Sequence, residues 1–313
     1  MNRNIIFFSC AVVVVLIGAV LPNEIHNSYV FYASFPILQF IVIGTGWNIL
    51  GGYAGYINFG SSAFVGAGTY AAVAGLNAFG APLGVQILFA ALIGALLGLA
   101  LGYLTLRLQG VFFSIATLAL TIVLETIVVN WQFVGGAGGA PALAPQSPLW
   151  FPNSVSYVWY VMLLLAVLGV ILARWIEHSW IGRGLAAIRA DEIAAECAGV
   201  PTLKLKLFAS VASGALIAVA GAPFPYYASY VDPSSVFSIN YALNALAMPL
   251  IGGVSSWAGP VIGAALLGAF EQVANVTLSA DFNLLLVGLV LVGVVALAPN
   301  GIIGIVRRLR TAG

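Results

Sequence analysis

The sequence predicts an all-α polytopic membrane protein with about ten transmembrane helices in two inverted five-helix halves. Of its 313 residues, 62% are hydrophobic and 6% are charged, whereas an average soluble domain has about 25% charged residues. The apolar residues form runs close to the ~20 residues that a bilayer core of about 30 Å requires. One stretch breaks this pattern, because nine of the nineteen charged residues lie at 174–206. This stretch is expected to face water.

The expected spans follow one another from the N-terminus. They cover residues 5–22, 30–50, 60–79, 83–106, 111–131, 157–173, 207–223, 239–253, 259–277 and 283–300. Residues 1–21 resemble a signal peptide, but their apolar run exceeds the usual length of about 7–15 residues and no small-x-small cleavage site follows it. We therefore expect them to remain as a span. The whole chain, 1–313, is expected to form one transmembrane domain, with a first half at 1–156 and a second at 157–313.

The charges predict the orientation, because Lys and Arg in short loops favour the cytoplasmic side. Ten crossings that start in the cytoplasm place all ten cations there, namely Arg3, Arg107, Arg174, Arg183, Arg189, Lys204, Lys206, Arg307, Arg308 and Arg310. Both termini are then cytoplasmic. The opposite side receives Glu24, His26, Asp232, Asp281 and the Gly- and Pro-rich loop 132–156.

Most of the 36 glycines lie inside apolar runs, where small residues let helices pack closely. Two Gly-rich regions also predict discontinuities in the third and eighth spans: NILGGYAGYINFGSS at 48–62 and NALAMPLIGGVSSWAGP at 244–260. Interrupted helices in two halves of a chain indicate a transport pathway, since unwound backbone in a membrane must be satisfied by protein or water. The inverted repeat itself is a hypothesis, because the two halves share little sequence.

Polar residues near the first region are candidates for this pathway: Asn48, Asn58, Ser61, Ser62, Thr69 and, in a later span, Glu125. A helix that begins near Ser61 would direct its free N–H groups at a substrate carboxylate. The alternative is that these small polar groups bond neighbouring helices.

Residues 174–206 predict two short helices parallel to the membrane. The first covers 182–188, and Asp191 caps the second over 192–198, which ends at Gly199 before Pro201. Their polar surface mixes both signs of charge, with Arg183, Arg189, Asp191, Glu192 and Glu196. A lipid-anchoring helix would be basic on its polar face, so this surface suits a protein partner.

The sequence SWIGRGLAAIRADEIAAECAGV at 179–200 resembles the coupling loop of ATP-binding-cassette importer permeases, and specifically the LivM-type branched-chain amino acid permeases. The resemblance extends to GWNILGGYAGYINFGSSAFVGAGTYAAV at 46–73 and PLIGGVSSWAGPVIGAALLGAF at 249–270. The chain departs from the general importer motif Glu-Ala-Ala-x-x-x-Gly, because Ile193 occupies the first position and the acid is displaced to Glu192.

The resemblance implies a multi-pass permease of the bacterial inner membrane that works with a second homologous permease, two cytoplasmic ATPases and a periplasmic binding protein. It implies branched-chain amino acids or related solutes, such as urea or aromatic carboxylates, as cargo, and no nucleic acid. It also implies that the cytoplasmic segment 174–206 couples to the ATPases, with Arg183 and Arg189 meeting ATPase acids. The coupling residues would be Gly182, Arg183, Arg189, Asp191, Glu192, Ala194, Ala195 and Gly199.

No catalytic, metal or cofactor site is expected in the chain itself. Lys204 and Lys206 both follow leucine rather than a phosphate-binding glycine loop, so ATP hydrolysis is assigned to separate subunits. His26 and His178 are expected on opposite faces and form neither a metal cluster nor a catalytic pair. A self-sufficient secondary transporter or channel that uses Glu125 and Glu271, two acids inside predicted spans, is the second hypothesis.

Overall fold

The computed structural model describes residues 3–24, 27–105, 110–142, 151–254 and 256–277, with short pieces at 288–289, 292–293 and 301–304. The long helices are α1 (Arg3–Glu24), α2 (Ser28–Trp47), α3 (Ser61–Phe79), α4 (Leu83–Thr105), α5 (Val111–Val129), α6 (Ser154–His178), α9 (Thr202–Gly221), α12 (Ile239–Gly252) and α13 (Ala258–Thr277). The short elements are the π-helical turn η1 (Asn48–Tyr53), η2 (Gln132–Val134), η3 (Gly136–Gly138), β1 (Ala140–Pro141), α7 (Trp180–Ala190), α8 (Glu192–Cys197), α10 (Phe224–Ala228), β2 (Tyr230–Val231) and α11 (Pro233–Val236).

Seven helical segments in the described part of the chain are long and apolar enough to cross a membrane. They are Ile5–Glu24, Ser28–Tyr53, Leu83–Leu104, Val111–Val129, Ser154–His178, Thr202–Ala228 and Pro233–Gly252. The chain is therefore a multi-pass membrane protein. The predicted tenth span, 283–300, lies outside the described residues except for four positions, and the division into two inverted halves stays a prediction.

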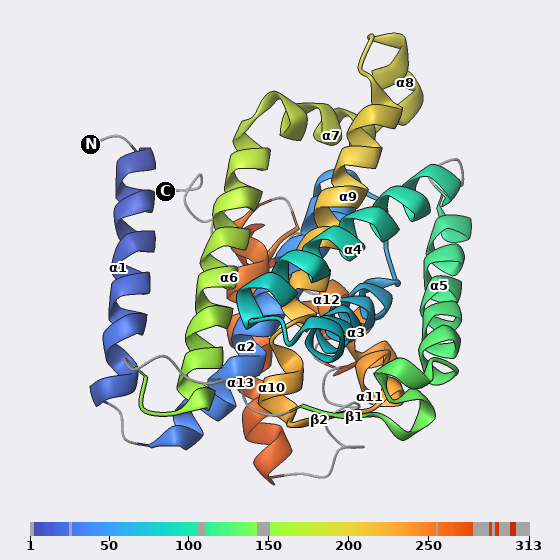
Figure 1. Cartoon of the computed structure of the whole chain (residues 1–313). Coiled ribbons are helices and arrows are strands. Elements are labelled where there is room, and N and C mark those ends of the chain that lie inside the picture. Colours follow the sequence, from blue (N-terminus) through green and yellow to red (C-terminus); the bar gives the residue numbers. More distant parts are fainter. Residues whose placement is uncertain are drawn as a thin grey trace.

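Helix α4 crosses the front of the bundle and packs on α9 (Figure 1). Two glycines spaced by four residues make this close contact possible. A Cβ on Gly94 would lie 2.5 Å from the carbonyl oxygen of Gly214, and a Cβ on Gly98 would lie 2.5 Å from that of Ser210. The Ser210 hydroxyl donates to the Gly98 carbonyl at 2.7 Å. The expected packing role of glycine is thus confirmed at this interface.

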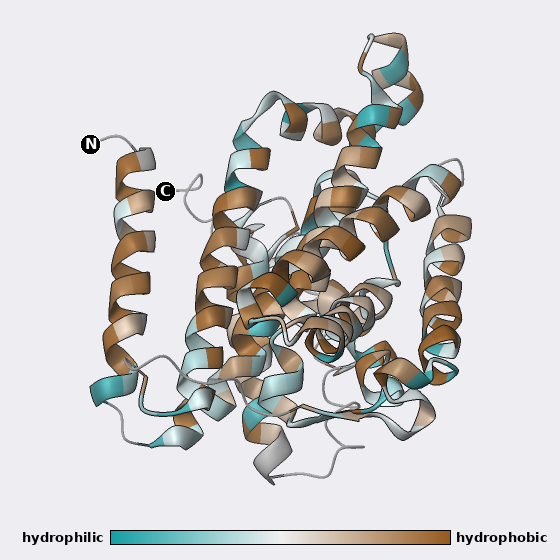
Figure 2. Cartoon of the chain, viewed as in Figure 1, coloured by the Kyte–Doolittle hydropathy of each residue, from teal (hydrophilic) through white to brown (hydrophobic). Residues whose placement is uncertain are grey.

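The helices differ in how far they are buried by protein. In α1, 11% of the apolar window is buried, and this helix stands at the edge of the bundle beside α6 (Figures 1 and 2). Most of α3, in contrast, is buried against α4 and α9. α1 therefore presents an apolar surface suited to lipid, whereas α3 belongs to the protein core.

The two ends of the bundle carry different elements. The N-terminal end of α1 lies on the same side as α7 and α8, and β1, β2, α10 and α11 lie on the other side (Figure 1). On that second side Ala140 pairs with Val231 and Pro141 with Tyr230 in a short antiparallel ladder. Figure 2 shows hydrophilic residues gathered on α7, α8 and the adjoining end of α9.

The irregular backbone lies beside the third and eighth spans rather than inside them, which corrects the predicted position of both discontinuities. α2 continues through η1, the backbone is non-helical at 54–60, and α3 is then continuous. α12 is also continuous, and the non-helical positions 253–254 and 256–257 follow it. Gly55 and Gly253 have φ values of +82° and +123°, which residues with a Cβ avoid, so the helix that precedes each glycine stops there. We call 54–60 the first break, and 253–254 together with 256–257 the second break.

Candidate functional site

The candidate site is the pair of short helices α7 and α8 together with the two breaks beneath them. α7 begins where Ser179 accepts a hydrogen bond from the Gly182 amide at 3.3 Å. A Cβ on Gly182 would lie 2.3 Å from the carbonyl oxygen of Ile176, so only glycine fits the corner between α6 and α7. Gly182 is buried in this corner, and it shapes the turn rather than presenting a contact surface.

Both ends of α8 are capped by its own neighbours in sequence. At the start, the Asp191 carboxylate accepts from the Ala194 amide at 3.0 Å, as predicted for the cap. At the end, the amides of Gly199 and Val200 donate to the carbonyls of Glu196 and Ala195 at 2.9 and 3.0 Å. This pair of bonds is a Schellman motif, which needs a left-handed residue at its turn. Gly199 supplies it with a φ of +83°.

The predicted alanine pair is split between the two sides of α8. Ala195 is 5% exposed and packs in the chain's own core, where Leu185 and Ile188 of α7 also lie. Ala194 is exposed. The expectation that both alanines face an ATPase is therefore wrong for Ala195, because this side of the short helix covers the core.

The outward surface of α7 and α8 is mixed in character. It carries the exposed Arg183, Ala194 and Glu196 together with Ile193, which is 72% exposed. This surface therefore offers charges of both signs next to one exposed apolar side chain.

Arg189 is tied to the chain itself. Its Nη1 donates to the Gly52 carbonyl in η1 at 2.6 Å, and its Cγ lies against Gly55 in the first break. Part of the guanidinium thus holds the end of α7 next to the first break, while the side chain remains exposed, and the expected contact of Arg189 with an ATPase acid stays a prediction.

Glu192 also bonds inward. Its Oε1 pairs with Lys206 Nζ at 2.5 Å and its Oε2 accepts from the Tyr56 hydroxyl at 2.5 Å. Burial raises the pKa of Glu192, but hydrogen bonds from Lys206 and Tyr56 outweigh it and bring the pKa below its ordinary value. Burial and the bond to Glu192 raise the pKa of Tyr56 well above its ordinary value.

Glu192, the displaced acid of the importer motif, therefore bonds two residues of its own chain. Those residues, Tyr56 and Lys206, belong to the site and were not predicted from the sequence. The sequence offered one signal for Lys206: it follows Lys204 by two positions and stands at the edge of an apolar run.

The second break is tied to the end of α6. Glu177 Oε2 accepts from the Trp257 amide at 2.6 Å and from the Tyr53 hydroxyl at 3.4 Å. Asn48 Nδ2 donates to the Ser256 carbonyl at 3.2 Å, which joins η1 to the second break. The end of α6 and η1 are thus bonded to each other and to the second break.

Two of the pathway candidates bond neighbouring helices. Ser62 lies 3.3 Å from Thr121 between hydroxyl oxygens, and the Thr69 hydroxyl donates to the Gly221 carbonyl at 3.0 Å. These contacts support the helix-bonding alternative for Ser62 and Thr69. The Asn58 side chain accepts from the Gly60 amide at 2.7 Å, a bond that stays within the first break.

The other candidates have different surroundings. Asn48 and Ser61 are fully buried, and Asn48 Oδ1 and Ser61 Oγ have no hydrogen-bond partner among the described residues. Glu125 on α5 is half-buried. Glu271, which the second hypothesis uses, is 8% exposed on α13.

A cavity of about 810 Å³ lies between the first break, the start of α5, the α7–α8 junction and α12. Its lining includes Tyr56, Ser114, Arg189, Glu192 and Leu250. This volume falls in the range of small-molecule sites, about 300–1,000 Å³, and combines apolar walls with a few polar groups. The cavity therefore extends from the α7–α8 junction to the first break.

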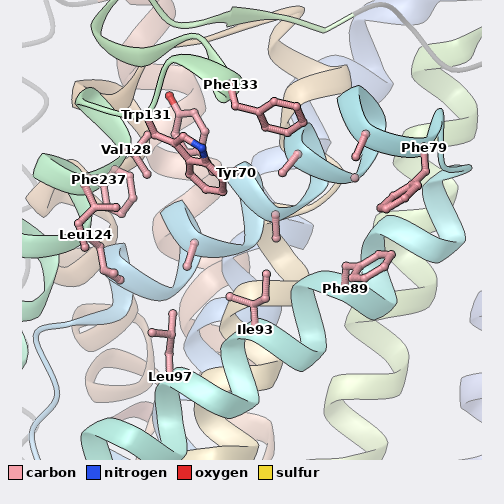
Figure 3. Close-up of a pocket in the computed structure, with 16 residues that line it drawn as sticks. Tyr70, Phe79, Phe89, Ile93, Leu97, Leu124, Val128, Trp131, Phe133 and Phe237 are labelled. Atoms are coloured by element: carbon pink, nitrogen blue, oxygen red, sulfur yellow. The ribbon is translucent and has the colours of Figure 1, made fainter.

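A second pocket, of about 340 Å³, lies between α3, α4 and α5 and is shown in Figure 3. Its labelled lining is aromatic and aliphatic, with Phe79, Phe89, Trp131 and Phe237 around it. None of its lining residues carries a charge. A zwitterion would lose its hydration here without gaining partners, so the pocket does not suit a free amino acid. The described residues also contain no cluster of metal-ligating side chains.

The sequence matches known permeases over most of its length. Residues 29–295 match the family described as branched-chain amino acid transport system / permease component. The high-affinity branched-chain amino acid transport system permease protein LivM of Salmonella typhimurium is 26% identical over 93% of this chain and 74% of its own length. LivM of Escherichia coli is 26% identical over 95% and 75%. The ribose import permease protein RbsC of Haemophilus influenzae is 25% identical over 70% and 69%. The chain belongs to the permease component family of branched-chain amino acid transport systems.

Proposed function

We propose that this chain is one of two pore-forming permeases in an ATP-driven importer of the bacterial inner membrane. It works with a second homologous permease, two cytoplasmic ATPases and a periplasmic binding protein. The observation that carries the proposal is the α7–α8 pair, which is capped at its junction and at its end and stands beyond the bundle (Figure 1). Arg189 fastens the pair to η1, Glu192 fastens it to Tyr56 in the first break, and the adjoining end of α6 bonds the second break.

The outward side of this pair is the proposed ATPase contact. Arg183, Glu196 and the exposed Ile193 offer charges of both signs around an apolar side chain. Such a surface fits a groove in a partner protein better than a lipid headgroup layer. The N-terminal end of α1 lies on the same side (Figure 1), so docking there makes the N-terminus cytoplasmic.

The proposed cargo is a branched-chain amino acid or a related small polar solute. Relatives named for branched-chain amino acids match more of the chain than the relative named for ribose. The cavity beside the first break is large enough for such a solute. With selection assigned to the binding protein, the permease needs no tight site of its own.

The test is uptake of leucine and ribose into proteoliposomes that contain either the chain alone or the chain with its partner subunits. Binding protein is supplied on one side, and ATP is supplied on either side. We expect leucine uptake that needs the partners and ATP on the α7–α8 side. Uptake by the chain alone, down or against an ion gradient, would overturn the proposal.

A surface variant tests the docking side separately. Ile193→Asp places a charge on the exposed first turn of α8 and is expected to reduce co-purification of the ATPases. Leu203→Asp is the control, because Leu203 is 51% exposed on the same side of the molecule but lies on α9. Equal loss in both variants would argue against a specific contact at α8.

A further inference from the structure

We infer that Lys206, Glu192 and Tyr56 form a joint that transmits movement of α8 to the first break, so that they are positioning residues for transport. The inference rests on the proposed importer function and assigns the step between ATPase docking and the pathway to three side chains. They come from three separate elements: Lys206 from α9, Glu192 from the start of α8 and Tyr56 from the first break.

The three groups are bonded to each other and withdrawn from water. Lys206 Nζ lies 2.5 Å from Glu192 Oε1, 3.3 Å from the Tyr56 hydroxyl and 5.3 Å from the centre of its ring. The Lys206 side chain is 6% exposed and that of Glu192 is 21% exposed. At such burial the attraction between charges is much stronger than at the surface, and removal of one partner leaves a charge without compensation.

Stability alone is a weak reason to keep this pair. A buried ion pair recovers little more than the cost of removing its charges from water, and apolar replacements of similar size are often as stable. The pair instead adds a defined geometry. Its hydrogen bonds fix the position of α8 relative to the first break, which apolar contacts do not do. Lys204, two positions earlier on the same helix, is exposed, so the inward placement belongs to Lys206 specifically.

The first break is the element that such a joint would move. Its backbone is non-helical between η1 and α3, and Tyr56 lies near its centre. Tyr56 and Glu192 both line the cavity of about 810 Å³. A displacement of α8 that is carried through Tyr56 therefore changes the shape of this cavity, next to the start of α3.

The joint is tested by the number of substrate molecules imported per ATP hydrolysed, measured with the complete transporter in proteoliposomes. Lys206→Met removes the charge and keeps the apolar stem. Tyr56→Phe removes a single hydroxyl and is the milder variant, to be used if Lys206→Met fails to assemble. We expect ATP hydrolysis to continue while the import ratio falls by about tenfold or more in Lys206→Met, which corresponds to ~1.4 kcal/mol of lost coupling.

Controls separate this joint from a purely structural role. Lys204→Met changes an exposed lysine on the same helix and should leave the ratio unchanged. The exchange Lys206→Glu with Glu192→Lys restores opposite charges and should recover part of the ratio. A ratio that stays at the wild-type value, or a parallel fall of hydrolysis and import, would overturn the joint. Wild-type uptake without ATP would instead overturn the proposed function.

Discussion

Replacement of Gly199 by valine is expected to abolish transport while the chain still inserts into the membrane. Gly199 ends α8 with a φ of +83°, and in the described part of the chain no atom beyond its immediate sequence neighbours lies within 4 Å of the position of a Cβ. The penalty is therefore conformational rather than steric. A left-handed backbone costs a residue with a Cβ about 1–2 kcal/mol, and a β-branched side chain is a poorer fit still.

The structure also gives the consequence of this strain. If the backbone leaves the left-handed region, the bonds from the Gly199 and Val200 amides to the last turn of α8 are lost. Each such bond contributes a net ~0.5–1.5 kcal/mol. α8 has six residues, so it has few other contacts to hold its end. The loss would release the contact between Ala195 and the core and leave the docking surface without a fixed shape.

The assay is substrate uptake by the assembled importer, divided by the amount of permease inserted in the membrane. Gly199→Asn is the informative comparison, because asparagine accepts the left-handed conformation, and it should retain most of the activity. Gly84→Val is the control for a glycine with open space and an ordinary φ. Normal uptake by Gly199→Val would refute the reasoning. Equal inactivity of the asparagine and valine variants would show that steric contact with a partner, and not backbone strain, matters at this position.

Three further outcomes are expected. Gly68→Ala should destabilise the solubilised protein by about 1–3 kcal/mol, seen as a lower thermal midpoint, since its Cβ would lie 1.9 Å from the Ala218 carbonyl oxygen. Gly75→Ala on the same helix should not lower the midpoint, because the nearest atoms to its Cβ lie at 3.9 Å. Similar midpoints for the two variants would contradict the close packing of Gly68. Asp191→Ala should lose a cap worth about 0.5–2 kcal/mol and reduce ATPase co-purification. Asp191→Asn should keep the cap and the co-purification, and reduced co-purification in both variants would indicate a need for the charge. The folded-state pKa of Glu192 lies below its ordinary value, so its stabilising effect is complete above an unfolded pKa of about 4.3 and is lost as the pH falls through the folded-state pKa. The thermal midpoints of wild type and Glu192→Gln should then converge on acidification, and a constant difference down to low pH would contradict this.

The caps of α8 were predictable because they depend on neighbouring residues. Asp191 bonds an amide three positions later, and Gly199 closes a turn on the preceding helix. Asp at an N-cap and Gly at a left-handed C-terminal position are preferences of the local backbone. These preferences apply however the rest of the chain folds.

The helix breaks were only partly predictable. The Gly-rich composition identified both regions, 48–62 and 244–260, and the helix ends at Tyr53 and Gly252 lie inside them, but α3 and α12 themselves are continuous. Ties such as the one from Glu177 to the Trp257 amide fix the irregular backbone. These ties join residues 80 positions apart, and no local pattern encodes them.

The sequence by itself determined the membrane class, the position of the charged segment 174–206 and the caps of its second helix, because hydropathy, charge and capping act over a few neighbouring residues. Only the tertiary structure decided that Ala195 faces inward while Ala194 faces outward, and that Glu192 meets Tyr56 across 136 positions of sequence. The physical reason is that a polar side chain's role depends on which distant group satisfies it once it is buried. Packing of the whole bundle selects that partner.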